Sequence, residues 1–95
     1  EEADAATLRT FIDNVKNKLG SGIIAVGSKQ GDKVFLAAGV TKDLTNKYHA
    51  GKIIREVAAI VGGSGGGRSD MAQAGGKFPE KLSTALKKIF EIIEK

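Results

Sequence analysis

The residues best suited to hold a phosphate group or a sugar-phosphate chain are concentrated in one glycine-rich segment, residues 62–77. It reads Gly-Gly-Ser-Gly-Gly-Gly-Arg-Ser-Asp-Met-Ala-Gln-Ala-Gly-Gly-Lys. Glycine has no side chain and accepts positive φ, so successive backbone N–H groups can converge on an anion or lie against a sugar-phosphate. Arg68 and Lys77 add cationic ends. Because the glycines run directly into a specific string, we interpret the segment as a binding loop rather than a flexible linker.

A phosphate-binding P-loop is a second interpretation of the same residues. Gly62 and the later Gly67-Arg68-Ser69 match the pattern GxxxxGKS except that arginine replaces the lysine. The exchange is not conservative, because a guanidinium is longer and planar where the motif needs a compact ammonium. A P-loop also joins a strand to a helix, whereas the residues before Gly62 are predicted to be helical. The dinucleotide pattern GxGxxG is absent, since Arg68 stands where its third glycine would be.

The elements that would hold this segment follow from the spacing of apolar residues. Apolar residues three and four apart predict helices over residues 4–19, 47–61 and 79–93. The short apolar runs 22–28 and 34–40, separated by turn residues, predict a β-hairpin. Both runs are apolar on both faces, which predicts a sheet covered by helices on most of its two sides.

These elements predict an α/β (α+β) fold in which a small sheet built on a β-hairpin packs with three helices, with a glycine-rich loop before the last helix. A lone hairpin makes a thin sheet, so we expect a further strand from the glycine-rich segment or from chain before Glu1. Gly20 should end the first helix, residues 41–46 could cap the second, and Pro79 suits the first position of the third.

Gly51 lies inside the predicted second helix, where glycine costs about 1 kcal/mol relative to alanine in an exposed position. Either another group approaches closely there, or the glycine is simply tolerated at the surface.

Composition limits the other functions that the chain could have. Its 95 residues are expected to form a single domain, residues 1–95, too short to supply the large sheet and the walls of a multi-substrate catalytic domain. There is no cysteine and one histidine, so we expect no disulfide, no zinc site and no cofactor. No apolar run approaches the roughly 18 residues of a membrane span and the N-terminus lacks a signal-peptide pattern, so a cytoplasmic protein without a membrane partner is expected.

Positive charge is concentrated in the middle of the chain. The net charge is +4 overall, with −3 over residues 1–15, +6 over residues 16–77 and +1 over residues 78–95. An anionic partner would therefore dock against the middle segment.

The string of residues 62–76 resembles the glycine-rich signature of the C-terminal domain of alanyl-tRNA synthetase, within the DHH-associated domain superfamily. The hairpin, the Lys42-Asp43-Leu44 segment and the His49-Ala50-Gly51 helix start resemble that family in the same order. The resemblance covers nearly the whole chain. The chain departs from the family in two ways. The family usually has proline at the position of Ser69, and it usually has a strand before the first helix. Because that strand is missing, the chain resembles a fragment, starting near Glu1, of a larger protein.

The resemblance implies a non-catalytic module of a synthetase that grips the outer corner of tRNA, where the D and T loops meet, and supports aminoacylation and editing. The implied partner is tRNA, with alanine tRNA recognised through the parent enzyme, itself an alanine-tRNA ligase. A folded RNA corner is read by its shape and backbone, which suits glycines with flanking cations. The candidate contact residues are Gly65, Gly66, Gly67, Arg68, Lys42, Lys47, His49, Lys52 and Lys77.

Two other classes of function stay open. The superfamily also includes the substrate-binding lobe of DHH phosphoesterases, although those enzymes typically carry a histidine near the end of the glycine run and this chain has no Asp-His-His cluster. The second class is self-association, in which apolar faces of the terminal helices pair to form a homodimer. Its motivation is Ile92, which lies off the main apolar stripe of the last helix.

Three other residues of the glycine-rich segment have expected roles. Asp70 and Gln73 could orient the segment or contact RNA, and Met71 is expected to pack beneath it.

Overall fold

The computed structural model describes residues 5–93, without the side chains of Ala5, Phe90 and Ile93. The contributions of these three side chains to the predicted apolar stripes, and residues 1–4, therefore lie outside the described part. The elements along the chain are α1 (Ala5–Leu19), β1 (Ile23–Gln30), β2 (Lys33–Val40), a 3-10 turn (Lys42–Leu44), α2 (Ala50–Ile60), β3 (Ser64–Gly67), β4 (Met71–Gly76), a second 3-10 turn (Pro79–Lys81) and α3 (Leu82–Ile93).

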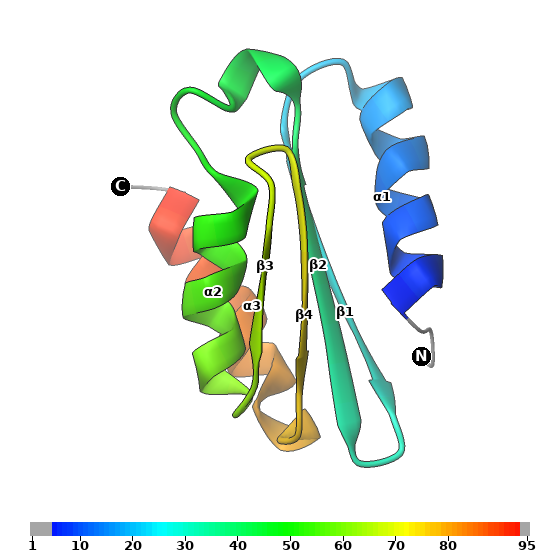
Figure 1. Ribbon diagram of the computed structural model, residues 1–95, viewed down its shortest axis with the longest axis vertical. Coiled ribbons are helices and arrows are strands. Elements are labelled where there is room, and N and C mark those ends of the chain that lie inside the picture. Colours follow the sequence, from blue (N-terminus) through cyan, green and yellow to red (C-terminus); the bar gives the residue numbers. More distant parts are fainter. Residues whose placement is uncertain (1–4, 94–95) are drawn as a thin grey trace.

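The four strands form one antiparallel sheet in the order β1-β2-β4-β3. Helix α1 packs on one face of the sheet, and α2 and α3 pack on the other (Figure 1). This arrangement confirms the predicted α+β class and the helical cover on both sides. It also explains why β2 is apolar on both of its faces, since alternate residues of β2 point into different cores.

Two hydrophobic clusters hold the layers together. The larger one joins β2, β4, α2 and α3, with Leu36 and Ile54 fully buried. The smaller one joins α1 to the sheet through Leu8, Ile12 and Ala37. A Cβ on Gly39 would lie 2.5 Å from Ile12, so glycine at this position lets α1 approach the sheet.

The first hairpin and the end of α1 agree with the sequence. A tight turn at Gly31-Asp32 joins β1 to β2, and Gly31 has a φ of 62°. Gly20 follows the last residue of α1 with a φ of 82°, the left-handed conformation in which glycine commonly ends a helix.

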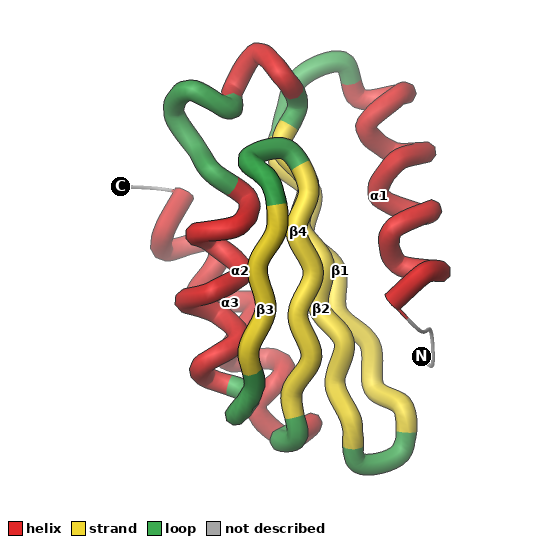
Figure 2. The backbone as a smooth tube through the Cα atoms, in the orientation of Figure 1, coloured by secondary structure: helices red, strands yellow, loops and turns green. Residues whose placement is uncertain are grey.

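The glycine-rich segment supplies strands rather than a long loop (Figure 2). The sequence predicted at least one further strand, and the structure contains two. Strands β3 and β4 form a second hairpin in which only residues 68–70 connect them. Ser64, Gly65, Gly66 and Gly67 pair with Gly75, Ala74, Gln73 and Ala72. Glycine is a poor strand former by propensity, so the local pattern indicated a loop where tertiary pairing makes a strand.

Several predicted details need correction. Helix α2 begins at Ala50 and not at Lys47, because His49 has extended backbone and acts as the N-cap. Pro79 opens a 3-10 turn, and α3 begins only at Leu82. Phe11 shares the three- and four-residue apolar spacing that predicts the first helix, yet 51% of it is exposed because α1 meets the sheet through a narrow row of residues. Ile92 packs against the larger core, so its position gives no support to self-association.

Candidate nucleic-acid interface

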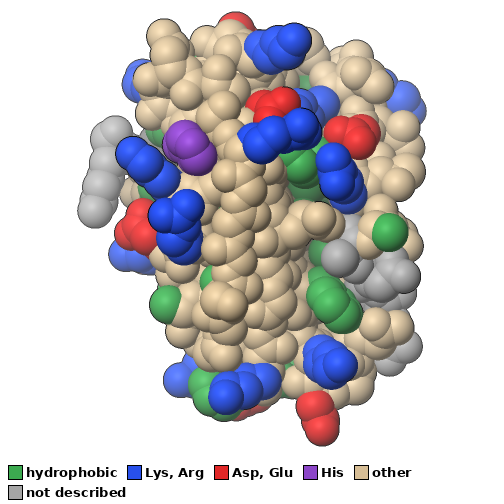
Figure 3. All heavy atoms as spheres, viewed as in Figure 1, with side chains coloured by type: hydrophobic (Ala, Val, Ile, Leu, Met, Phe, Trp, Pro, Cys, Tyr) green, Lys and Arg blue, Asp and Glu red, His purple; other side chains and the backbone are tan. Residues whose placement is uncertain are grey.

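The edge strand β3 carries almost no side chain on its open face. Ala72 and Ala74 of β4 point into the larger core, so their neighbours Gln73 and Gly75 point to the other face, together with Gly66 and Ser64 across the pair. All four of these residues are at least partly exposed. Figure 3 shows this strip as a nearly flat band of backbone and polar atoms, with cationic side chains gathered at its two ends.

The three glycines of β3 have different reasons for lacking a side chain. A Cβ on Gly65 would lie 2.4 Å from the Gln73 carbonyl oxygen, and one on Gly67 would lie 2.6 Å from the Met71 carbonyl oxygen. Gly66 is different, because its nearest neighbours would be guanidinium atoms of Arg55 at 3.9 Å. Gly65 and Gly67 are therefore required by strand packing, whereas Gly66 keeps the open face free of side chains.

The turn between β3 and β4 is tied to α2 and β2 through its backbone. The carbonyl oxygens of Arg68 and Ser69 accept hydrogen bonds from the first N–H groups of α2, at 3.1 Å from Gly51 and 2.9 Å from Ala50. The Asp70 carbonyl accepts from the N–H of Val40 at 2.9 Å. Ser69 stands where the resembling family usually has proline. Because this contact uses only the backbone carbonyl of Ser69, serine at this position leaves the contact intact.

Gly51 is the point of closest approach between α2 and this turn. A Cβ there would lie 2.7 Å from the carbonyl oxygen of Gly67. Of the two interpretations of a glycine inside this helix, close approach is therefore the one that the structure confirms.

Asp70 organises the turn internally. Its carboxylate lies 3.4 Å from Nε of Arg68 and 4.0 Å from the ammonium of Lys16, and Lys16 also donates to the Asp70 carbonyl at 3.1 Å. The Arg68 side chain is still 70% exposed. These surface ion pairs orient Arg68 toward solvent without burying it, and each contributes little to stability.

The remaining predicted cations divide between the two ends of the β3–β4 hairpin. Lys42, Lys47, His49 and Lys52 belong to the segment that joins β2 to α2 and to the first turn of α2, at the same end as Arg68. Lys77 lies at the other end, about 20 Å away along the six residues of β4. The structure therefore places four of these five residues at the end of the hairpin that carries Arg68, and Lys77 at the opposite end.

Two of the gathered side chains also have local structural roles. Nδ1 of His49 accepts a hydrogen bond from the N–H of Lys52 at 3.3 Å and so caps α2. The ammonium of Lys47 lies 5.7 Å from the centre of the Tyr48 ring. Met71 is buried in the smaller core, as expected.

Sequence reasoning missed two basic residues. Arg55 lies three residues after Lys52 on the exposed face of α2 and reaches the edge strand at Gly66. Its spacing from Lys52 was a usable signal, because residues three apart share a helix face. Lys16 carried no such signal, since nothing local indicates that α1 passes beside Asp70.

A cluster of hydroxyl groups fixes the segment that carries Lys42. The hydroxyls of Ser21 and Thr41 both donate to the carboxylate of Asp43, and Thr41 also accepts from the N–H of Gly22 at 3.0 Å. The bonds from Ser21 and Thr41 lower the pKa of Asp43 from its ordinary value. No helix in the described part of the chain is long and apolar enough to cross a membrane.

Comparison with known proteins agrees with this architecture. The DHHA1 domain model matches residues 1–95. The alanine–tRNA ligase of Idiomarina loihiensis is 56% identical over 86 residues, which is 90% of this chain and 10% of the ligase. That of Bacillus subtilis is 58% identical over 84 residues, 87% of this chain and 10% of the ligase. The chain thus spans about a tenth of the length of these curated relatives.

A solved structure shares the whole fold. The crystal structure of the C-Ala domain from Aquifex aeolicus alanyl-tRNA synthetase superposes with a TM-score of 0.93 at 36% sequence identity, covering 99% of this chain and 85% of that one. The chain belongs to the DHHA1 domain family and, within it, to the C-terminal domains of alanyl-tRNA synthetases.

Proposed function

We propose that this domain is a non-catalytic tRNA-binding module of an alanine–tRNA ligase, and that it holds the outer corner of tRNA through the β3–β4 hairpin. The observation that carries the proposal is the open face of β3, where Gly66 leaves the backbone bare beside the exposed Arg68 and Arg55 side chains. The names of the relatives and of the structural neighbour supply the identity of the RNA.

The chemistry of the face suits a folded RNA. A bare backbone lets a sugar-phosphate chain approach closely, and its N–H and C=O groups can contact phosphates and 2′-hydroxyls. Arginine recognises phosphate oxygens with two parallel hydrogen bonds. Exposed aromatic side chains are few on this face, so stacking of single-stranded bases contributes little.

The role in the parent enzyme is the one that the resemblance to the family implies. A module that holds the tRNA corner would keep one tRNA bound while its acceptor end is aminoacylated and proofread. Lys42, Lys47, His49 and Lys52 belong to segments at the end of the hairpin that carries Arg68 and would add contacts to the RNA, while Lys77 would contribute less.

Binding assays with the domain would test this proposal. We expect full-length tRNA to bind more tightly than single-stranded RNA or duplex DNA of equal length, with an affinity that falls as salt rises. Arg68→Ala should weaken binding and make the slope of log K against log salt shallower by about one. Gly66→Val should weaken binding by filling the open face.

The two variants need a control that leaves the fold and the charge intact. Ala59→Val alters an exposed position of α2 that no candidate contact uses. Equal binding of all three nucleic acids, unchanged in Arg68→Ala and Gly66→Val, would reduce the interaction to nonspecific charge and contradict the proposal.

A further inference from the structure

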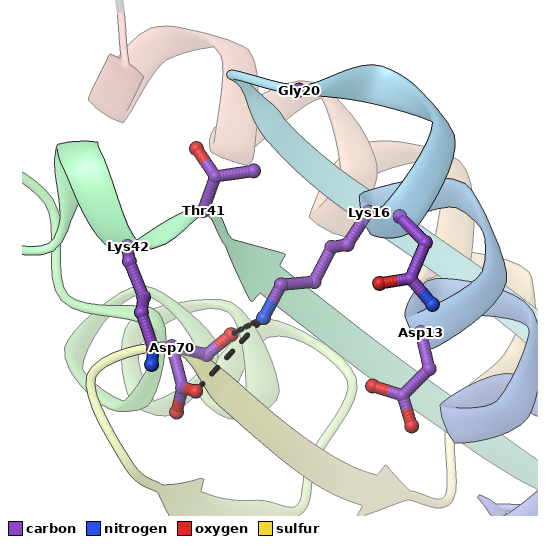
Figure 4. A pocket seen from close by; sticks show the side chains of 7 residues that line it. Asp13, Lys16, Gly20, Thr41, Lys42 and Asp70 are labelled. Atoms are coloured by element: carbon purple, nitrogen blue, oxygen red, sulfur yellow. Dashed lines mark hydrogen bonds and ion pairs between the residues drawn. The ribbon is translucent and has the colours of Figure 1, made fainter.

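A surface pocket of about 550 Å³ lies beside the Arg68 turn, between the end of α1 and the start of the first 3-10 turn. This volume falls within the range of about 300–1,000 Å³ that is usual for small-ligand sites. Its polar lining residues are Asp13, Lys16, Asn17, Thr41, Lys42 and Asp70. Figure 4 shows Asp13 on one side of the pocket, Lys42 and Asp70 on the other, and the Lys16 side chain extending between them.

The lining side chains divide into occupied and free groups. Lys16, Asp70 and Thr41 are committed to the contacts that hold the turn and the Asp43 cluster. Among the described residues, no side-chain partner contacts Asp13, Asn17 or Lys42. Asp13 and Asn17 lie four residues apart and therefore on one face of α1. The pocket thus offers a free carboxylate and a free amide opposite a free ammonium.

The charge of the pocket differs from that of the surrounding surface. Two lysines and two aspartates line it, so their formal charges cancel. A phosphate group would meet the carboxylates of Asp13 and Asp70 as well as the ammonium groups. The lining instead favours a neutral, polar ligand with donors for Asp13 and acceptors for Lys42, because an ionised carboxylate only accepts and an ammonium only donates.

Guanine is the base that presents both sets of groups side by side. Its N1–H and N2 amino group are adjacent donors that a carboxylate can accept together, while O6 and N7 are acceptors for a lysine. Adenine offers a single amino group and no N1–H. The adjoining turn presents Arg68, where a phosphate of the same nucleotide chain would be held.

We propose that this pocket binds one unstacked guanine of the RNA, with Asp13 accepting from N1–H and N2 and Lys42 donating to O6 or N7. The inference rests on the proposed function, since it takes the guanine to be part of the RNA held by the hairpin. Single bases of a folded RNA that are turned out of the stack are the usual targets of such readout.

Nucleotide titrations followed by NMR would test the pocket directly. GMP and AMP carry the same ribose and phosphate, so a difference between them reports the base. We expect GMP to bind about tenfold more tightly than AMP, as one bidentate contact would give, with the largest shifts in the amide signals of residues 13–17 and 41–42. Inosine monophosphate lacks the N2 amino group and should bind more weakly than GMP.

Two variants separate the base contact from general charge. Asp13→Asn should bring the affinities for GMP and AMP to within about twofold, because the amide no longer accepts both donors. Asp32→Asn removes the same charge in the β1–β2 turn, far from the pocket in the fold, and should keep the preference for GMP. Equal binding of GMP and AMP, or a GMP preference that survives Asp13→Asn, would overturn the inference.

Binding of full-length tRNA measured in parallel keeps the two proposals distinct. If the wild-type domain binds tRNA in a way that depends on Arg68 but shows no preference for GMP, the guanine pocket is overturned and the tRNA-binding function stands. A GMP preference that depends on Asp13, without tRNA binding, would support the base contact and overturn the tRNA-binding function.

Discussion

Glycine has two different physical roles within the four residues of β3. Gly65 and Gly67 face atoms of β4 so closely that a Cβ would collide with backbone, whereas a Cβ on Gly66 would meet only the flexible end of Arg55. Gly65 and Gly67 are therefore needed for β3 to pack against β4, whereas Gly66 shapes the surface that a ligand contacts. A run of three identical residues in the sequence conceals this difference.

Substitution by valine should separate these roles. Gly65→Val is expected to lower the free energy of unfolding by about 1–3 kcal/mol or more, because the side chain has no room against Ala74. Gly66→Val should change it by no more than about 0.5 kcal/mol, as is usual for surface positions. Urea denaturation of both variants measures the difference, and equal destabilisation would show that Gly66 is also required by packing.

The carboxylate of Asp43 makes a pH-dependent contribution to stability. The hydroxyls of Ser21 and Thr41 lower its pKa in the folded state, so the folded protein favours the ionised form. The resulting stabilisation is fully present at neutral pH and is lost as the pH falls from its unfolded pKa of about 3.9 through the lower folded value.

Asp43→Asn should therefore be less stable than the wild type at pH 7, and the gap should narrow below about pH 4. Urea midpoints measured at pH 7, 5 and 3.5 would show this trend. Asp32→Asn, in the exposed β1–β2 turn, serves as the control, because it removes the same charge without touching the hydroxyl groups of Ser21 and Thr41. A gap that stays constant across this range would contradict the assignment.

At the scale of elements, the start of α2 and the β3–β4 turn act as one unit. The carbonyl oxygens of Arg68 and Ser69 satisfy N–H groups in the first turn of α2 that have no partner within the helix. The helix thereby fixes the position of Arg68, while the turn completes the cap begun by His49. Contacts of this kind cannot be inferred from either segment alone.

Gly51→Ala tests this unit because two effects have opposite signs. In an open helix the change from glycine to alanine stabilises by about 1 kcal/mol. Here the new methyl group would lie 2.7 Å from the Gly67 carbonyl oxygen, so we expect net destabilisation. Thermal and urea unfolding would give the sign, and a more stable variant would mean that the turn moves away without cost. Ala59→Gly reports the ordinary glycine penalty at an exposed position of the same helix.

At the scale of the whole molecule, the layers decide which charges act together. Helix α1 covers β1, β2 and Met71 of β4 but leaves the rest of the open face of β3 and β4 uncovered, and α2 brings Arg55 to the edge strand (Figures 1 and 3). Cations from α2, the β3–β4 turn and the segment after β2 therefore converge at one end of the hairpin. Lys77, although it belongs to the same glycine-rich segment, lies at the opposite end.

This separation predicts unequal effects of removing single charges. Arg55→Ala should weaken tRNA binding and reduce the salt slope by about one, as expected for the loss of one phosphate contact. Lys77→Ala changes the net charge by the same amount and should have a clearly smaller effect. Fluorescence anisotropy over a salt series measures both, and equal effects of the two variants would mean that RNA covers the full length of the hairpin.

The sequence by itself determined the elements and their class, because hydrophobic spacing reports which face of each segment is buried. The three helices, the first hairpin and the end of α1 at Gly20 were readable in this way. Arg68 was identifiable as a contact candidate from its neighbours and from the family signature. Gly51 was recognisable as anomalous, although its partner was not.

Only the tertiary structure decided that the glycine segment is a hairpin, that Gly66 differs from Gly65, that Arg55 reaches Gly66 and that Lys16 contacts Asp70. The physical reason is the same in each case. These properties depend on contacts between segments that are distant in the chain, such as Gly67 with Gly51 and Asp70 with Lys16. Local spacing and propensity describe a residue's own element, and they carry no information about which other element packs against it.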